Sequence, residues 1–189
     1  MDDYLHQLSQ HLGEKLLARN WRIATAESCT GGGVAAAIAA ISGSSAWFEY
    51  GIVSYANAAK EKLLGVSSET LARHGAVSEA VVIEMARGVL ALSGADIAVA
   101  ISGVAGPSGG SHEKPVGTVW FAWARATGEI KTELKWFDGD REAVQKQAVV
   151  WALEKSISTS MDSPAEFANK EEIRDLSKDV VECASPPLN

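Results

Sequence analysis

The sequence predicts an α/β sandwich in which helices pack on a mixed β-sheet. Three observations lead to this fold class. Strand-like and helix-like segments alternate along the chain, residues 95–102 are apolar at nearly every position, and residues 118–137 alternate well enough for a hairpin. A continuous apolar run is typical of a strand buried on both faces, and a hairpin adds antiparallel strands to the sheet. At 189 residues the chain is long enough for one domain with a substantial core.

The first half of the chain supplies helices and two strands in alternation. Apolar residues recur at helical spacing at Tyr4, Leu5, Leu8, Leu12 and Leu16, which predicts an amphipathic first helix. A short strand over residues 22–26 runs into three glycines and a helix of small residues over 34–41. A second strand over about 50–55 leads into a helix that begins near Asn57 and is ended by Gly65.

The second half supplies helix caps, the buried strand and the hairpin. Candidate N-caps are Ser67 or Ser68, Ser78, and Asp138 or Asp140. The hairpin is expected to turn at Thr127 and Gly128, and a last long helix to cover 141–157. We therefore expect one domain over residues 1–160, followed by a polar tail over 161–189 that is loosely ordered apart from one short helix.

The composition argues against several functional classes. Lys and Arg total 17 against 24 Asp and Glu, a net charge of -7, so non-specific binding to nucleic acid is not expected. The densest apolar run, residues 34–41, is far shorter than the roughly 20 residues that cross a bilayer, and the acidic N-terminus has no apolar signal segment. Cys29 and Cys183 form neither a disulfide framework nor a metal motif. We expect a cytoplasmic protein that uses no metal or other cofactor and binds no membrane.

Residues 28–33 form the first candidate site, because a strand ends there and a helix begins. Free N–H groups at a helix start attract anions, and the three glycines permit close approach of a ligand. The alternative is an ordinary N-cap by Ser28 or Thr30 ahead of a tightly packed helix. Cys29 is either a reactive thiolate or a small packed thiol, and no histidine lies nearby in the sequence to activate it.

A second candidate site combines serine hydroxyls with a lysine. Ser44, Ser45, Tyr55 and Lys60 fall within one loop, strand and helix start. A neutral lysine can take the proton of a serine hydroxyl if burial or a nearby cation lowers its pKa. The alternative for Lys60 is a solvated surface position. No GxGxxG fingerprint follows the first strand, which argues against a dehydrogenase.

Two further places suggest ligand binding. The glycine-rich loop over 103–117 follows the most buried strand, and open α/β sheets bind ligands beyond the carboxyl ends of their strands, although a flexible surface loop is the alternative. This loop lacks the GK[ST] ending of a nucleoside-triphosphate loop, so ATP chemistry is not supported. Arg141 stands in the first turn of a helix, where acids are favoured, so it either binds phosphate or pairs with Asp138 or Glu142.

Several long motifs in order resemble those of the CinA C-terminal domain family. They are TAESCTGG, GSSAWFEYGIVSYANAAKEKLLGV, HGAVSE, ISGVAGPSGGSHEKPVGTVWFA and GDREAV, and the resemblance spans about Leu5 to Leu153. It implies a three-layer sandwich whose mixed sheet is flanked by helices. It also implies a stand-alone amidase of pyridine-nucleotide salvage, which converts nicotinamide mononucleotide to nicotinate mononucleotide and ammonia with a serine nucleophile, a lysine base and no metal.

The resemblance also implies roles for individual residues. The positions that match the family's catalytic group are Ser45, Tyr55 and Lys60, with Ser28 as the rival nucleophile. The positions that match the shell around the nucleotide are Thr30, Gly31, Ser102, Gly103 and Arg141. Tyr50 stands where relatives are expected to carry Arg, which keeps open a second hypothesis, a catalytically silent relative that binds a nucleotide as a sensor or partner protein. The expected partner is a small-molecule nucleotide, and a homo-oligomer stays open.

Overall fold

The computed structural model describes residues 3–163, in which helices and strands alternate. The helices are α1 (Asp3–Ala18), α2 (Gly33–Ala39), the short 3-10 helix η1 (Ser44–Ala46), α3 (Asn57–Leu64), α4 (Ser68–His74), α5 (Glu79–Ser93) and α6 (Arg141–Met161). The strands are β1 (Ile23–Glu27), β2 (Phe48–Val53), β3 (Ile97–Gly103), β4 (Thr118–Arg125) and β5 (Ile130–Trp136).

The five strands form one mixed sheet in the order β2-β1-β3-β4-β5. Strand β1 runs parallel to both β2 and β3, whereas β3 with β4 and β4 with β5 are antiparallel. The antiparallel half is the predicted hairpin, which turns between Arg125 and Ile130. The predicted mixed sheet is confirmed.

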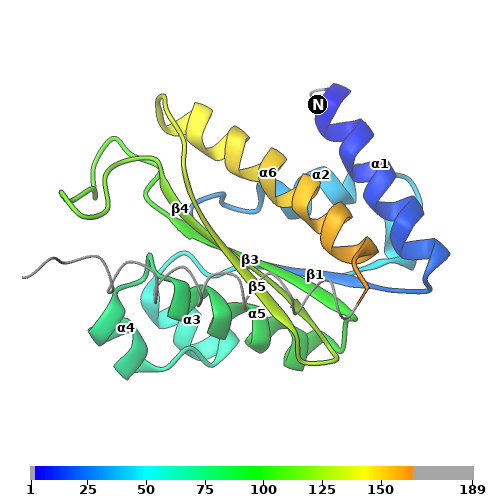
Figure 1. Ribbon diagram of the computed structural model, residues 1–189, viewed down its shortest axis with the longest axis horizontal. Coiled ribbons are helices and arrows are strands. Elements are labelled where there is room, and N and C mark those ends of the chain that lie inside the picture. The colour runs from blue at the N-terminus through cyan, green and yellow to red at the C-terminus, as the bar shows by residue number, and fades with distance from the viewer. Residues whose placement is uncertain (1–2, 164–189) are drawn as a thin grey trace, which may run out of the picture.

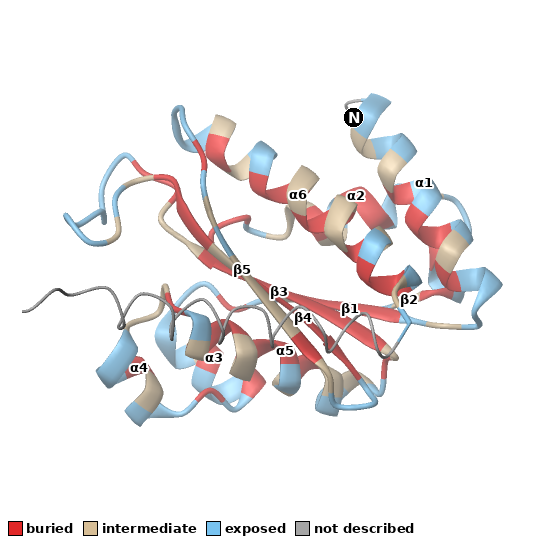
Figure 2. Cartoon of the chain, viewed as in Figure 1, coloured by how far each residue is buried: buried red, intermediate tan, exposed pale blue. Residues whose placement is uncertain are grey.

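Helices cover both faces of the sheet, so the fold has three layers. Figure 1 shows α1, α2 and α6 on one face and α3, α4 and α5 on the other. In Figure 2 the strands of the sheet interior are buried, whereas the outward sides of the helices are exposed. The core is therefore divided into two apolar clusters, one on each side of the sheet. The predicted α/β sandwich is confirmed.

The two faces of the sheet carry side chains of different size. On β3, Ile97, Val99 and Ile101 belong to the cluster under α1, α2 and α6, whereas Ala98 and Ala100 belong to the cluster under α5. All five side chains are fully buried, which explains why this segment is apolar at every position. The small alanines make room for α5, which packs along β3 and β4.

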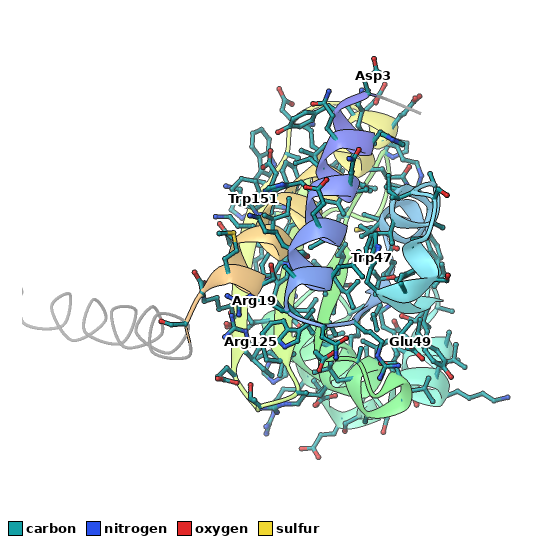
Figure 3. All side chains as sticks on the ribbon, turned by 90° about the vertical axis from the view of Figure 1, so that its right-hand side faces the viewer. Asp3, Arg19, Trp47, Glu49, Arg125 and Trp151 are labelled. Carbon is teal, nitrogen blue, oxygen red and sulfur yellow. The ribbon has the colours of Figure 1, made fainter. Side chains whose placement is uncertain are left out.

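The N-terminal helix is fitted to a buried tryptophan. Trp47 follows η1 and is 2% exposed, and a Cβ on Gly13 of α1 would come within 2.7 Å of its ring. Figure 3 shows Trp47 beside α1. A glycine is needed at this contact because any side chain would push α1 away from the ring. This packing also fixes η1, the turn that carries Ser44 and Ser45, at the amino end of β2.

The last helix runs further than its apolar pattern predicts. It was expected to end near residue 157 but continues to Met161. Hydroxyls of its final turns bond back to carbonyl oxygens: Ser158 and Thr159 donate to Lys155, and Ser160 donates to Ile157. The hydroxyls of these last turns thus find their acceptors within the helix, so polar residues continue it where an apolar periodicity has ended.

Other boundaries agree with the sequence to within two residues. The caps are Ser67, Ser78 and Asp140, each accepting from an N–H of the first helical turn. Strand β2 begins at Phe48, not near Tyr50, because Phe48 already pairs with Ile23 of β1. Of the expected tail over 161–189, residues 164–189 lie outside the described residues. Within 3–163, no helix is long and apolar enough to cross a membrane.

Candidate active site

A pocket of about 300 Å³ opens at the carboxyl ends of β1 and β3. It is lined by Ser28, Cys29, Tyr55, Lys60, Ala76, Val77, Ser102, Gly103, Val104, Ala105, Gly106, Ser108, Gly109 and Arg141. The only basic side chains in this lining are Lys60 and Arg141, and no Asp or Glu contributes to it. The pocket is therefore locally positive in a protein whose net charge is -7.

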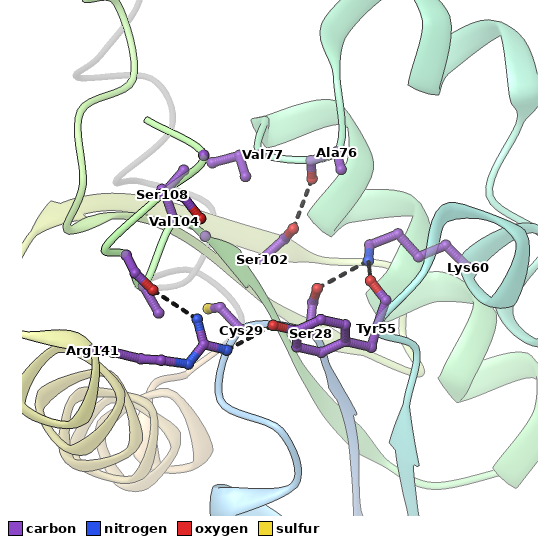
Figure 4. Close-up of a pocket in the computed structure, with 14 residues that line it drawn as sticks. Ser28, Cys29, Tyr55, Lys60, Ala76, Val77, Ser102, Val104, Ser108 and Arg141 are labelled. Carbon is purple, nitrogen blue, oxygen red and sulfur yellow. Dashed lines mark hydrogen bonds between the residues drawn. The ribbon is translucent and has the colours of Figure 1, made fainter. Parts of the chain in front are cut away.

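The sheet register brings a serine and a lysine together in this pocket. Strands β1 and β2 run parallel with Glu27 beside Val53, so Ser28 and Ser54 leave the sheet next to each other. Helix α3 follows β2, and its Lys60 reaches back to this edge. Lys60 Nζ lies 3.0 Å from Ser28 Oγ and donates to the carbonyl oxygen of Tyr55 at 3.3 Å (Figure 4). It also donates to the carbonyl oxygen of Ser54 at 2.7 Å.

Burial favours the neutral form of Lys60. The side chain is 1% exposed, and no ion pair within residues 3–163 involves it. Desolvation lowers the pKa of the Lys60 amine below the ordinary value for lysine, because the charged form loses its hydration. A neutral amine beside a hydroxyl can accept its proton, so the pair has the geometry of an activated serine. The solvated-surface interpretation of Lys60 is wrong.

Arg141 lies across the pocket from Lys60 and is held from two sides. Its Nη1 donates to the carbonyl oxygen of Gly106 at 2.8 Å, and its Nη2 donates to the Tyr55 hydroxyl at 2.6 Å. Figure 4 shows the Tyr55 ring directed toward Arg141, while only the Tyr55 carbonyl is near Lys60. Arg141 makes no ion pair with Asp138 or Glu142. Its guanidinium is thus oriented toward the pocket, where it can meet an anion.

Ser102 and Gly103 line the pocket at the end of β3. The Ser102 hydroxyl donates to the carbonyl oxygen of Ala76 at 2.7 Å, so it connects β3 with the turn between α4 and α5. A Cβ on Gly103 would come within 2.8 Å of the carbonyl oxygen of Thr118. A glycine is therefore required there by the close approach of β4, independently of any ligand.

The N–H groups at the start of α2 donate to a buried carboxylate, that of Glu27. Glu27 is fully buried and accepts from the N–H groups of Gly32, Val34 and Ala35 at 2.8 to 3.1 Å. It also accepts from the Thr30 hydroxyl at 2.7 Å. These are the donors that an external anion would need, so the predicted anion site at this helix start is wrong. The alternative of a hydroxyl cap is also wrong, because Gly32 is the N-cap residue and Thr30 donates to Glu27.

The predicted residues therefore divide into two groups. The pocket brings together Ser28, Tyr55, Lys60, Ser102, Gly103 and Arg141. Thr30 and Gly31 do not line it. Ser45 belongs to η1 at the amino end of β2, whereas Lys60 lies beyond its carboxyl end. The six residues of β2 separate the two by about 20 Å of strand, so the structure does not bring Ser45 to Lys60.

Comparison with known proteins identifies the family. The family model described as the CinA C-terminal domain matches residues 5–159. The chain belongs to the CinA C-terminal domain family. A family relative from Escherichia coli strain K12, nicotinamide-nucleotide amidohydrolase PncC, is 60% identical over 153 residues, which cover 81% of this chain and 93% of the relative. The protein of the same name from Pseudomonas putida is 54% identical, over 80% of this chain and 94% of the relative.

Solved structures of CinA proteins share this fold. A CinA superfamily protein from Klebsiella pneumoniae has a TM-score of 0.80 at 49% identity and covers 82% of this chain and 97% of its own. A competence/damage-inducible protein from Agrobacterium tumefaciens has a TM-score of 0.79 at 40% identity, over 82% of this chain and 94% of its own. The three-layer fold expected from the CinA resemblance is thus confirmed.

Tyr50, which stands where relatives are expected to carry Arg, lies away from the pocket. Tyr50 is on β2, pairs with Ala24 of β1, and is 42% exposed. It is not among the residues that line the pocket. The structure therefore gives no reason to connect Tyr50 with loss of catalysis.

Cys29 lines the pocket but is not a thiolate. Burial raises the pKa of its thiol to about 12, which keeps the sulfur protonated at neutral pH. The packed-thiol interpretation is therefore favoured over the nucleophile. Within residues 3–163, no three His, Cys, Asp or Glu side chains gather where they could hold a metal ion.

Sequence reasoning missed Glu27, which organises the segment around Ser28. One signal was available. Glu27 is the one acidic residue between positions 22 and 48, and it stands four positions before the first of three glycines at the expected helix start. A carboxylate in that position can accept hydrogen bonds from the N–H groups of the first helical turn, so the chain itself supplies the anion.

Proposed function

We propose that the chain hydrolyses the carboxamide of nicotinamide mononucleotide, giving nicotinate mononucleotide and ammonia, with Ser28 as nucleophile and Lys60 as its base. The observation that carries this proposal is the 3.0 Å contact between the buried Lys60 amine and the Ser28 hydroxyl. The E. coli and P. putida relatives, named as nicotinamide-nucleotide amidohydrolases, support the choice of substrate.

The first half of the reaction forms an acyl-enzyme. Neutral Lys60 takes the proton from Ser28 Oγ, and the oxygen attacks the carboxamide carbon. The carbonyl oxygen becomes negative as the tetrahedral intermediate forms. The C–N bond then breaks, and the Lys60 ammonium returns the proton to the departing nitrogen, which leaves as ammonia.

The second half releases the product. Water gives a proton to Lys60 and attacks the ester carbon. The bond to Ser28 Oγ breaks, Lys60 returns the proton to that oxygen, and nicotinate mononucleotide leaves. Each half-reaction returns Lys60 to its neutral form, so one amine serves as base and acid in both.

Donors for the developing negative charge are expected on the loop after β3. Those at the start of α2 are in use, since Gly31 N–H donates to Ser28 and Gly32 N–H to Glu27. The N–H of Val104 donates to Thr118. The next two N–H groups, of Ala105 and Gly106, line the pocket and donate no hydrogen bond within residues 3–163. Losing one such donor typically reduces the rate about 100-fold to 1,000-fold.

Arg141 is expected to bind the phosphate of the nucleotide. Its guanidinium can form two parallel hydrogen bonds with phosphate oxygens, and no acidic side chain in the pocket competes for it. Tyr55 then acts by orienting Arg141, because its hydroxyl accepts from Nη2. In this scheme Tyr55 transfers no proton. A cytoplasmic location and a homo-oligomer stay predictions.

The test is ammonia release by the purified protein in the presence of a chelator. Nicotinamide mononucleotide should give ammonia and nicotinate mononucleotide in equal amounts, and free nicotinamide, which lacks the phosphate, should give much less. Binding of the mononucleotide without ammonia release would overturn the proposal and favour a catalytically silent nucleotide-binding protein.

A further inference from the structure

The pocket has two facing walls that come from different parts of the chain. One wall is the loop after β3, residues 104–109, and the other is the turn between α4 and α5, which contributes Ala76 and Val77. Neither wall belongs to a helix or strand, so the distance between them depends on side-chain contacts.

Three successive carbonyl oxygens of the turn each accept a side-chain donor. The carbonyl of His74 accepts from Lys114 Nζ at 2.8 Å, that of Gly75 from the Ser78 hydroxyl at 2.9 Å, and that of Ala76 from the Ser102 hydroxyl at 2.7 Å. Ser78 is the N-cap of the next helix, α5, and Ser102 belongs to the sheet. Lys114 is the only one of these three donors that lies in the loop after β3, the loop that forms the opposite wall.

The position of Lys114 within that loop is fixed locally. The N–H of Ser111 donates to the carbonyl oxygen of Lys114 at 2.9 Å, and the N–H of Lys114 donates to the Ser111 hydroxyl at 3.1 Å. The Lys114 ammonium contacts His74, the last residue of α4. The negative end of the helix dipole and the carbonyl oxygens that have no partner within the helix favour a cation there. Lys114 does not itself line the pocket.

We propose that Lys114 is a positioning residue for the amidase reaction, which sets the width of the pocket by joining its two walls. This inference rests on the proposed function for its kinetic part. The ammonium holds the loop against the α4 terminus, and the Ser102 hydroxyl fixes the same turn to the sheet. The substrate then enters a pocket whose width is already set, and the binding step does not have to order the loop.

The test compares Lys114→Met with Lys114→Arg and with a matched control, Lys62→Met. Lys62 is an exposed lysine in the last turn of another short helix, α3, so its replacement removes the same charge without touching either wall. Amide hydrogen exchange without substrate should be faster in Lys114→Met at residues 75–77 and 104–110, and unchanged in Lys62→Met. The KM for nicotinamide mononucleotide should rise about fivefold or more with a smaller change in kcat, and Lys114→Arg should restore most of the loss.

Two results would overturn the role of Lys114. Unchanged exchange of both walls in Lys114→Met would show that the contact does not join them, whether or not the protein is an amidase. Faster exchange with unchanged KM would show that the width of the pocket does not depend on it. If the wild-type protein releases no ammonia, the proposed function fails, while the exchange measurement still decides whether Lys114 joins the walls.

Discussion

Lys60 Nζ lies 3.0 Å from Ser28 Oγ, although 32 positions separate the two residues in the chain. The parallel pairing of β1 with β2 creates this contact, because both strands end at the same edge of the sheet. The amine contacts backbone carbonyls and no carboxylate. Burial lowers its pKa, because the charged form loses its hydration, and this leaves the amine available as a base. The chemistry of the site therefore follows from the register of two strands.

The first prediction concerns the pH dependence of the reaction. Only neutral Lys60 can accept a proton, so kcat/KM should rise with pH as the amine is deprotonated. Because burial lowers the pKa of Lys60, the rise should be complete below the pH at which an ordinary lysine titrates.

The variant Lys60→Arg tests the same amine. An arginine side chain stays protonated and cannot act as a base, so the variant should lose at least about a thousandfold in kcat. Steady-state ammonia release from pH 6 to pH 11 measures both effects. A Lys60→Arg variant with near wild-type turnover would remove Lys60 as the base.

The second prediction concerns phosphate recognition by Arg141. Arg141→Lys keeps the charge but loses the planar fork that Gly106 and Tyr55 orient, so KM for nicotinamide mononucleotide should rise about tenfold or more. Activity on nicotinamide riboside, which has no phosphate, should change much less. Tyr55→Phe should give a smaller effect in the same direction. Equal losses on both substrates would mean that Arg141 does not recognise the phosphate.

The third prediction concerns the stability of the segment around Ser28. Glu27→Gln turns an acceptor of several hydrogen bonds into a group that carries its own N–H donors, and some of the N–H groups of α2 lose their partner. The free energy of unfolding should fall by about 2 to 4 kcal/mol, which urea denaturation measures. Thr30→Val removes a single donor to the same carboxylate and should cost about 1 kcal/mol. A loss for Glu27→Gln no larger than that for Thr30→Val would contradict the account of α2.

The fourth prediction concerns the reactivity of Cys29. With a thiol pKa of about 12 and 5% exposure, Cys29 should resist iodoacetamide at pH 8 in the folded protein and react once the protein is unfolded in urea. Peptide mapping separates its signal from that of Cys183. Rapid alkylation of folded Cys29, with parallel loss of activity, would reopen the thiolate as the nucleophile.

Much of the fold was predictable because local patterns and burial agree. Residues 97–101 of β3 are apolar at every position because both faces of the strand are covered, and Asp140, Ser67 and Ser78 cap helices as their residue types predict. The end of α6 was not predictable from periodicity, since its last turns carry Ser158 and Thr159, whose hydroxyls donate to a carbonyl oxygen of the same helix.

The site was predictable only in part, because it depends on contacts between distant segments. Lys60 and Arg141 were found from their residue type and position. The proposed choice of Ser28 over Ser45 needed the direction of β2, which places Ser45 at the amino end of that strand, whereas Ser28 follows β1 beside its carboxyl end. The role of Glu27 needed the knowledge that its carboxylate turns toward α2.

The central claim is that Ser28, activated by Lys60, is the nucleophile. The most direct measurement is the rate of ammonia release from nicotinamide mononucleotide by wild type, Ser28→Ala and Ser45→Ala, purified in parallel and shown to be folded by circular dichroism. Ser28→Ala should lose at least about a thousandfold in kcat, whereas Ser45→Ala should stay within about twofold of wild type. A Ser28→Ala variant that retains substantial turnover, or a Ser45→Ala variant that loses it, would contradict the account.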